Sequence, residues 1–185
     1  MDRKKQLMEV ALKLFVENGF HGTATAKIAK EANVANGTLF QYFATKEALI
    51  VAVFKEVKGE LADLLAEEST GKPVKDLLKI QFTSSIRWAL KNIQKFQYIQ
   101  QFYSSPYIQL MEQTDIKKYI EPHLSLIREG IETNTIRRLD VELVYQLFSS
   151  QTFGVIQYLI TGKKKNQEKI IEESFLLLWD MFKVQ

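Results

Sequence analysis

Small polar side chains recur in the first third of the chain, at the spacing expected of two short helices joined by a tight turn. Thr38, Gln41 and Tyr42 are predicted to project from the outer face of the second of these helices, which begins at Asn36. Their hydroxyl and amide groups can bond to phosphates and base edges, and a glutamine can pair with adenine through two hydrogen bonds. Because Gly37 has no side chain, the backbone there can approach a base or a phosphate closely. The pattern favours a surface that binds double-stranded DNA.

Residues at the ends of these helices could add contacts to the DNA backbone. Asn36 lies at the start of a helix, whose positive dipole end suits a phosphate. Lys46 begins the next helix, where its charge opposes the dipole, and a bound phosphate would account for its place there. Thr23 is predicted to be the N-cap of the first short helix, and Thr25 follows it closely. The complete set of predicted DNA contacts is Thr23, Thr25, Asn36, Gly37, Thr38, Gln41, Tyr42 and Lys46.

The composition excludes several other kinds of site. The 185 residues include no cysteine and only two histidines, His21 and His123, so disulfides and thiolate sites are excluded and no metal site is expected. No Ser/His/Asp set, paired carboxylates or phosphate-binding loop is found, so neither an enzyme nor a cofactor is expected. The net charge is +3, and residues 1–57 carry eight Lys/Arg against six Asp/Glu, which does not indicate a nucleic-acid binder. The prediction of DNA binding therefore depends on the pattern of residues.

The elements that must position these residues are predicted to be helices. Apolar residues recur at helical spacing along nearly the whole chain and no period-two strand is found, which predicts an all-α protein. Gly19 is expected to end the first helix, and Asn33 to take a left-handed conformation between the two short helices. About nine helices are predicted, over residues 3–18, 23–32, 36–42, 46–68, 73–91, 93–103, 107–132, 141–160 and 167–184. The predicted domains are a helix-turn-helix domain (1–46) and a helical ligand-binding and dimerisation domain (47–185).

A long ungapped pattern extends over the first third of the chain: Leu14-Phe15, Gly19-Phe20, Thr23, Ile28-Ala29, Ala32, Val34, Gly37-Thr38-Leu39-Phe40, Tyr42-Phe43, Lys46-Glu47 and Leu49. It resembles the DNA-binding domain of the TetR family of bacterial transcriptional regulators. The resemblance implies a recognition helix that starts at Gly37 and Thr38, and backbone contacts from Thr23, Tyr42 and Lys46. Three positions depart from the pattern: Ala35 stands where a capping serine is common, Asn33 replaces a common glycine, and Phe40 replaces a common tyrosine. Three apolar residues of this segment are expected to pack in the core: Leu39, Phe40 and Phe43.

Beyond the first third, the resemblance implies a dimer and a small-molecule ligand. The last two helices are apolar on broad faces, and in the family they form the dimer interface; Gly154 in mid-helix is expected to permit close packing. The predicted interface residues are Phe153, Gly154, Gln157, Leu178, Trp179 and Phe182. Aromatic residues in the middle of the chain could line a pocket for an apolar or aromatic ligand. The candidates are Trp88, Phe96, Phe102, Tyr103, Tyr107, Tyr119 and Phe148.

The function that the resemblance implies is sequence-specific transcriptional regulation, by a ligand-responsive repressor that binds a palindromic DNA operator as a homodimer. The alternative is an all-α protein–protein interaction module that keeps the fold without binding DNA. The N-terminus lacks the apolar run of a signal peptide. Polar residues interrupt the most apolar segments, 143–160 and 170–182, so no membrane association is expected and the predicted location is cytoplasmic.

Overall fold

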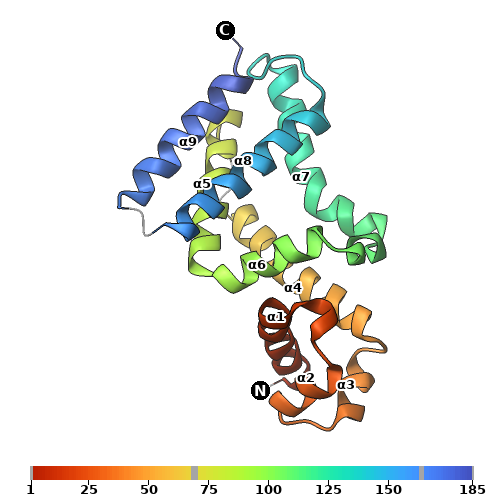
Figure 1. Cartoon of the computed structure of the whole chain (residues 1–185). Helices are drawn as coiled ribbons and strands as arrows, with labels where there is room; N and C mark the ends of the chain where they lie inside the picture. Colours follow the sequence, from red (N-terminus) through yellow and green to blue (C-terminus); the bar gives the residue numbers. More distant parts are fainter. Residues whose placement is uncertain (1, 68–70, 163–164, 185) are drawn as a thin grey trace. The chain divides into compact units, whose positions relative to one another are not determined.

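The computed structural model describes residues 2–67, 71–162 and 165–184, and these residues form an all-α fold (Figure 1). Their helices are α1 (Arg3–Gly22), α2 (Thr25–Glu31), α3 (Asn36–Tyr42), α4 (Lys46–Glu67), α5 (Val74–Lys91), α6 (Ile93–Tyr103), the 3₁₀ helix η1 (Pro106–Leu110), α7 (Gln113–Glu132), α8 (Val141–Thr161) and α9 (Gln167–Phe182). The predicted all-α class and helix number are confirmed. Among the described residues, no helix is long and apolar enough to cross a membrane.

Contacts divide the chain into two compact units, each with its own core. Unit 1 consists of residues 1–60 and 92–115, and unit 2 of residues 61–91 and 116–185. This division follows packing and differs from the predicted domain boundary at 46/47, which concerned the DNA-binding role and stays a prediction. Helix α6 therefore belongs with the short N-terminal helices, although about 50 residues separate it from them in the sequence.

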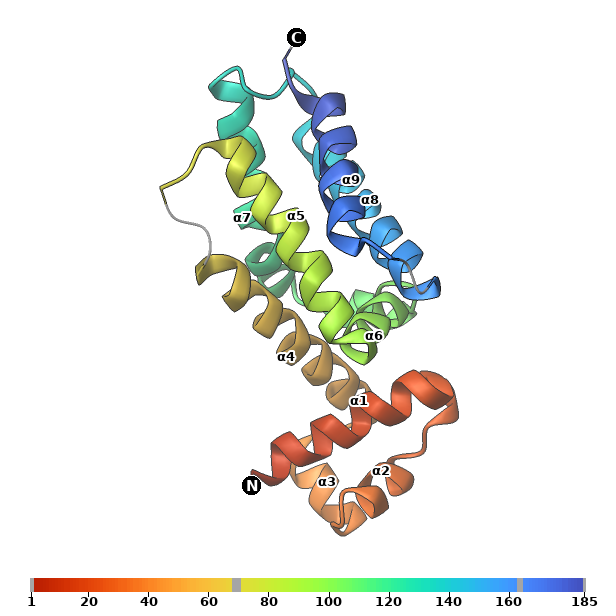
Figure 2. The same cartoon turned by 90° about the vertical axis from the view of Figure 1, so that its left-hand side faces the viewer.

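Aromatic side chains of α1 and α6 hold unit 1 together. Tyr98 of α6 is fully buried, and its ring lies edge-to-face with Phe20 at 5.5 Å and 6.2 Å from the ring of Phe15. Its hydroxyl donates a 2.8 Å hydrogen bond to the carbonyl of Ile50 in α4. Burial raises the pKa of Tyr98 well above its ordinary value, so this donor stays protonated. One side chain thus joins α1, α4 and α6, and Figure 2 shows α2 and α3 below α1.

Helix α5 is the centre of unit 2. It packs against both α8 and α9, which also pack against each other (Figure 1). The ring of Phe82 in α5 lies 5.9 Å from that of Phe148 in α8 and 5.8 Å from that of Phe175 in α9. Burial of these aromatic side chains stabilises the three-helix contact, because each removes a large apolar area from water.

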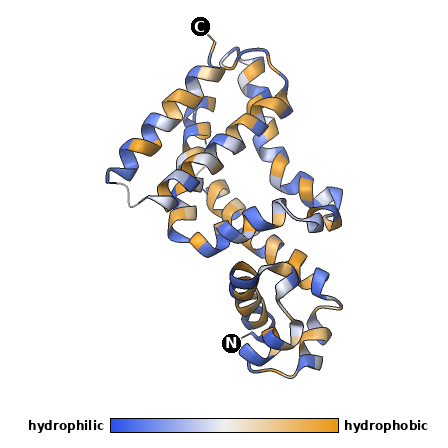
Figure 3. Cartoon of the chain, in the orientation of Figure 1, coloured by the Kyte–Doolittle hydropathy of each residue, from blue (hydrophilic) through white to orange (hydrophobic). Residues whose placement is uncertain are grey.

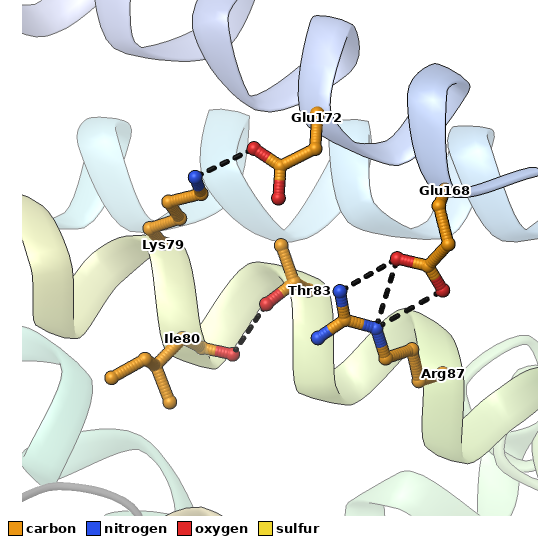
Figure 4. A network of polar contacts seen from close by, with 6 residues as sticks. All are labelled: Lys79, Ile80, Thr83, Arg87, Glu168 and Glu172. Carbon is orange, nitrogen blue, oxygen red and sulfur yellow. Dashed lines mark hydrogen bonds and ion pairs between the residues drawn. The ribbon is translucent and has the colours of Figure 1, made fainter.

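Ion pairs connect the outer sides of α5 and α9 (Figure 4). Arg87 donates to Glu168 at 2.6 Å, and Lys79 lies 2.6 Å from Glu172. The carboxylate of Glu168 has its pKa lowered by the Arg87 hydrogen bond. All four side chains are largely exposed, so each pair contributes at most about 1 kcal/mol. The pairs set the register of α9 on α5 more than they stabilise it.

A close backbone approach ends α7. The carbonyl of Gly130 accepts hydrogen bonds of 2.8 Å from the amides of both Thr135 and Ile136. A Cβ atom at Gly130 would lie 2.5 Å from Cδ1 of Ile136, whose side chain is fully buried. Asn134 takes φ = 56°, a left-handed conformation that is common at helix C-termini. This turn therefore requires glycine at position 130.

Candidate nucleic-acid interface

Helices α2 and α3 form a compact helix-turn-helix in unit 1. The turn passes through Asn33 with φ = 53°, which confirms the predicted left-handed residue. The amide of Val34 donates a 3.0 Å hydrogen bond to the carbonyl of Ala29 and closes the turn. Ile28 and Ala29 are buried, so small and branched apolar side chains hold α2 against the rest of the unit. The closed turn and the packing of α2 fix the direction of α3 relative to α2.

Helix α3 presents a polar surface and hides an apolar one. Its bounds, Asn36 to Tyr42, are those predicted from the sequence. Leu39 is fully buried, whereas Asn36, Gly37, Gln41 and Tyr42 are exposed and Thr38 is half-buried. At 100° per residue, Gly37 and Gln41 point away from Leu39. The predicted DNA contacts of α3 therefore lie where a major groove could be reached.

The helix ends around this surface are capped unequally. Ala35 occupies the N-cap of α3 and supplies no side-chain hydrogen bond. At the start of α4, the hydroxyl of Thr45 accepts a 3.0 Å hydrogen bond from the amide of Ala48. The neighbouring Lys46 is half-buried, as is Thr25 in the first turn of α2. Backbone amides at the start of α3 consequently lack the side-chain acceptor that a capping serine would supply.

Thr23 does not belong to this surface, and its prediction as a DNA contact and N-cap is wrong. Its side chain is fully buried, and its hydroxyl lies within hydrogen-bond distance of the carbonyls of Gly19 (2.8 Å) and Leu14 (3.1 Å). Ala24 is the N-cap of α2. The hydroxyl stabilises the break at the end of α1, where Gly19 has φ = 76°, and cannot reach a phosphate.

Phe40 differs from its prediction in the opposite direction. It was expected in the core with Leu39 and Phe43, but its side chain is 43% exposed on α3. Phe43 is buried as expected. Positions 39 and 40 are 100° apart around the helix, so Phe40 does not share the inward-facing side of Leu39.

A basic residue next to α3 was missed in the sequence. The ammonium of Lys4 lies 5.9 Å from the ring centroid of Phe43, directly after α3. Lys4 belongs to an exposed basic group, Arg3-Lys4-Lys5, in a helix turn that contains no acidic residue. Three positive charges at a helix N-terminus oppose the dipole, which was an available signal for a nearby anion. Because α3 itself carries no charged side chain, any charged contact to a phosphate would come from neighbouring elements such as the start of α1.

The predicted dimer residues fall on two sides of α8 and α9. On α8, Gly154 is exposed and Phe153 and Gln157 are half-buried. On α9, the side chains of Leu178, Trp179 and Phe182 are buried within the protomer, so these three predictions are corrected. Apolar segments recur along both helices (Figure 3), and the exposed large apolar residues are Leu143, Leu147, Tyr158, Leu176, Leu177 and Met181.

The predicted ligand-pocket residues are divided between the units. Phe96, Phe102, Tyr103 and Tyr107 lie in unit 1, and Trp88, Tyr119 and Phe148 lie in unit 2. Phe102 is fully buried and stacks on Phe54 at 3.9 Å, and Tyr107 packs edge-to-face on Phe20 at 5.3 Å. Packing within unit 1 accounts for Phe102 and Tyr107, whereas Tyr103 is 42% exposed; the role of all seven residues towards a ligand stays a prediction.

Unit 2 contains a polar cluster that the sequence did not predict. Gln81 is buried in α5, and its Oε1 lies 2.9 Å from Nδ1 of His123 in α7. The ring of Tyr145 in α8 lies 5.7 Å from that of His123. Desolvation raises the pKa of Tyr145, while a hydrogen bond with Ser149 acts in the other direction. We call Gln81, His123, Tyr145 and Ser149 the polar cluster of unit 2. These residues are too far apart in the sequence to form a recognisable motif.

Comparisons with known proteins agree with this geometry. The family model for bacterial regulatory proteins, tetR family, matches residues 7–53. The fatty acid metabolism regulator protein of Bacillus subtilis (strain 168) is 29% identical over 168 residues, which cover 89% of this chain and 84% of that protein.

Solved structures extend the likeness to the whole chain. A tetR family transcription regulator from Shewanella sp. PV-4 is 30% identical, with a TM-score of 0.92 over 100% of both chains. FadR from Bacillus subtilis, solved in complex with stearoyl-CoA, has a TM-score of 0.82 at 23% identity and covers 94% of this chain and 96% of its own. At 23% identity, the similarity to FadR shows a shared fold.

Proposed function

Because the chain belongs to the TetR family and is a DNA-binding transcriptional regulator, we propose that it is a ligand-responsive repressor that binds a palindromic operator as a homodimer. The exposed polar face of α3 carries the proposal, since Leu39 locks the opposite face into the core. Gln41 reads a base edge and Lys46 binds a phosphate. The family likeness favours this function over an interaction module that does not bind DNA.

The DNA contacts are tested by separating base reading from backbone binding. Gln41→Ala is expected to weaken operator binding by about 1–3 kcal/mol and to relax sequence preference, because it removes a base contact. Lys46→Ala should weaken all sequences alike and lower the salt slope of log K by about 0.9. Gln97→Ala in α6 is the matched control, an exposed glutamine outside the helix-turn-helix. Equal effects of Gln41→Ala and Gln97→Ala would contradict the assignment.

The proposed dimer is supported by the apolar surface of α8 and α9. Leu177 is 67% exposed, the highest value among the exposed large apolar residues. A Cβ atom at Gly154 would meet nothing within 4 Å, so the protomer gives no reason for a glycine in mid-helix. A partner helix in close contact would supply one. Two copies would place their recognition helices one DNA turn apart, about 34 Å.

Sedimentation velocity over a range of protein concentrations tests the dimer. Leu177→Asp should shift the protein towards monomer, because a charge would be buried at the interface. Leu110→Asp in η1 is the control, since Leu110 is also exposed but lies in unit 1. An unchanged dimer in Leu177→Asp, with both variants folded by circular dichroism, would contradict this interface.

The proposed ligand has a long apolar part and an uncharged hydrogen-bonding group, as in a fatty acyl thioester. Two similar proteins support this class: the fatty acid metabolism regulator protein of Bacillus subtilis and FadR, solved in complex with stearoyl-CoA. The polar cluster of unit 2 supports an uncharged group, because buried polar residues of the described chain include no charged side chain. Gln81 and His123 bind the ligand's carbonyl in this proposal, and the apolar interior of unit 2 holds its chain.

Titration of the operator complex with acyl-CoAs of graded chain length tests the ligand. Stearoyl-CoA should release the protein, while free coenzyme A should not. Gln81→Leu should reduce the response without changing operator affinity in the absence of ligand. Release is a population shift, so the operator must weaken acyl-CoA binding by the same factor that acyl-CoA weakens operator binding. Operator affinity that no acyl-CoA changes would remove this ligand class and leave the DNA-binding function intact.

A further inference from the structure

Phe40 is an exposed aromatic side chain on the helix that reads DNA. It is 43% exposed, although Leu39 before it in α3 and Phe43, the C-cap residue of α3, are buried. Tyr42 is equally exposed, but it has a hydroxyl that can bond to phosphate or water. Phe40 has no hydrogen-bonding group. It is therefore the one exposed side chain of α3 whose chemistry cannot serve a phosphate or a polar base edge.

The surroundings of Phe40 leave one flank of the ring open. Residues three and four apart are neighbours on a helix surface, so Phe40 lies beside Gly37 and Asn36. A Cβ atom at Gly37 would meet no atom within 4 Å. Gln41, whose amide can pair with adenine, follows directly in the sequence. The ring thus borders the open space at Gly37 and lies 100° around the helix from Gln41.

We propose that Phe40 contacts the 5-methyl group of a thymine in each operator half-site and so determines specificity at that base pair. The inference rests on the proposed operator binding. Among the groups that base pairs present in the major groove, the thymine methyl is the apolar one, and a phenyl ring can contact it. The open flank at Gly37 admits the methyl without a competing side chain. The contact removes both the ring and the methyl from water.

Deoxyuridine tests the contact, because it differs from thymidine only by this methyl. Each thymine of the selected operator is replaced in turn, and the Kd is measured by fluorescence anisotropy. A buried methyl contributes about 0.8 kcal/mol to the binding free energy. Replacing the contacted thymine in one half-site should therefore weaken binding by the wild-type protein about fourfold. Replacement in both half-sites should weaken binding about fifteenfold. Phe40→Ala should bind the thymidine and deoxyuridine operators equally.

Two further variants separate the loss of the methyl contact from other effects of mutation in α3. Gln41→Ala should lose affinity but keep the wild-type ratio between thymidine and deoxyuridine operators, because it removes a different contact. Phe40→Leu should keep part of the ratio and serves as the apolar replacement if Phe40→Ala does not fold. Wild-type protein that is indifferent to deoxyuridine at every position, or a Phe40→Ala ratio equal to that of wild type, would overturn the proposal. Failure of the proposed function is distinct, since no specific operator would then be selected.

Discussion

The two units differ in what their interiors contain. Among the described residues of unit 1, the hydroxyls of Thr23 and Tyr98 lie in the core, and both bond to backbone carbonyls. Unit 2 holds the other buried polar residues of the described chain: Gln81, Thr83, Ser84 and Thr152. A unit that reads DNA needs a fixed surface, and a closed aromatic core supplies one. A unit that recognises a ligand needs polar side chains in an apolar setting, and only unit 2 supplies several.

The largest expected effect sharpens the contrast in packing. Phe102→Ala removes a buried ring that stacks on Phe54 at 3.9 Å, and should lower the free energy of unfolding by about 3–5 kcal/mol. Phe148→Ala removes a ring that is slightly exposed and lies edge-to-face with Phe82 at 5.9 Å, so its loss should be smaller. Urea denaturation measures both values. A larger loss for Phe148→Ala would contradict the expectation that the stacked pair in unit 1 contributes more to stability than the edge-to-face pair in unit 2.

The next effect concerns close backbone approach in unit 2. Gly130→Ala should destabilise the protein by about 1–3 kcal/mol, because its Cβ would lie 2.5 Å from Ile136 Cδ1. Gly154→Ala, with open space around its Cβ, should instead stabilise the monomer by about 1 kcal/mol. Thermal denaturation below the dimerisation concentration compares them. Equal signs for the two variants would contradict the local packing of α7.

A matched pair of threonines compares the hydroxyls of the two cores. Thr23→Val should lower the free energy of unfolding by about 1–3 kcal/mol, because the Gly19 carbonyl at the break in α1 loses the hydroxyl donor, while the Leu14 carbonyl keeps Asn18 Nδ2 as a donor. Thr152→Val should lower the free energy of unfolding by roughly a few tenths of a kcal/mol. The Thr152 hydroxyl only adds a 2.8 Å hydrogen bond to the Phe148 carbonyl of its own helix. Chemical denaturation of both variants gives the difference. Similar values would show that the hydroxyl of Thr23 is not needed to end α1.

The last effect is a pH dependence in unit 1. Lys58 of α4 is half-buried, with its ammonium 6.0 Å from the ring centroid of Tyr103, and desolvation lowers its pKa to about 8. Between about pH 8 and pH 10.5 the unfolded chain then binds more protons than the native one, so the free energy of unfolding should rise with pH. Lys58→Met should flatten this rise, and Lys91→Met, at an exposed position, should not. The same slope in all three proteins would exclude the desolvated lysine.

Local features of the helix-turn-helix could be predicted from the sequence, and long-range ones could not. The bounds of α3 and the left-handed Asn33 follow from residue types within a few positions. Thr23 was assigned to DNA because its partner, the carbonyl of Leu14, lies nine residues away and is invisible to a capping rule. Leu178, Trp179 and Phe182 were assigned to the dimer because α9 is apolar on two faces, and only the packing of α5 decides which is inside. The polar cluster of unit 2 comes from three separate helices, and nothing in the sequence brings them together.

The most direct test of the central claim is selection of binding sites from random duplex DNA with the intact protein. The account predicts an inverted repeat whose half-site centres lie about one helical turn apart, with affinity that falls steeply as salt rises. Selection with Gln41→Ala should relax the consensus at one position of each half-site. No enriched sequence from folded wild-type protein, or the same consensus from wild type and Gln41→Ala, would contradict the claim that the exposed face of α3 reads the operator.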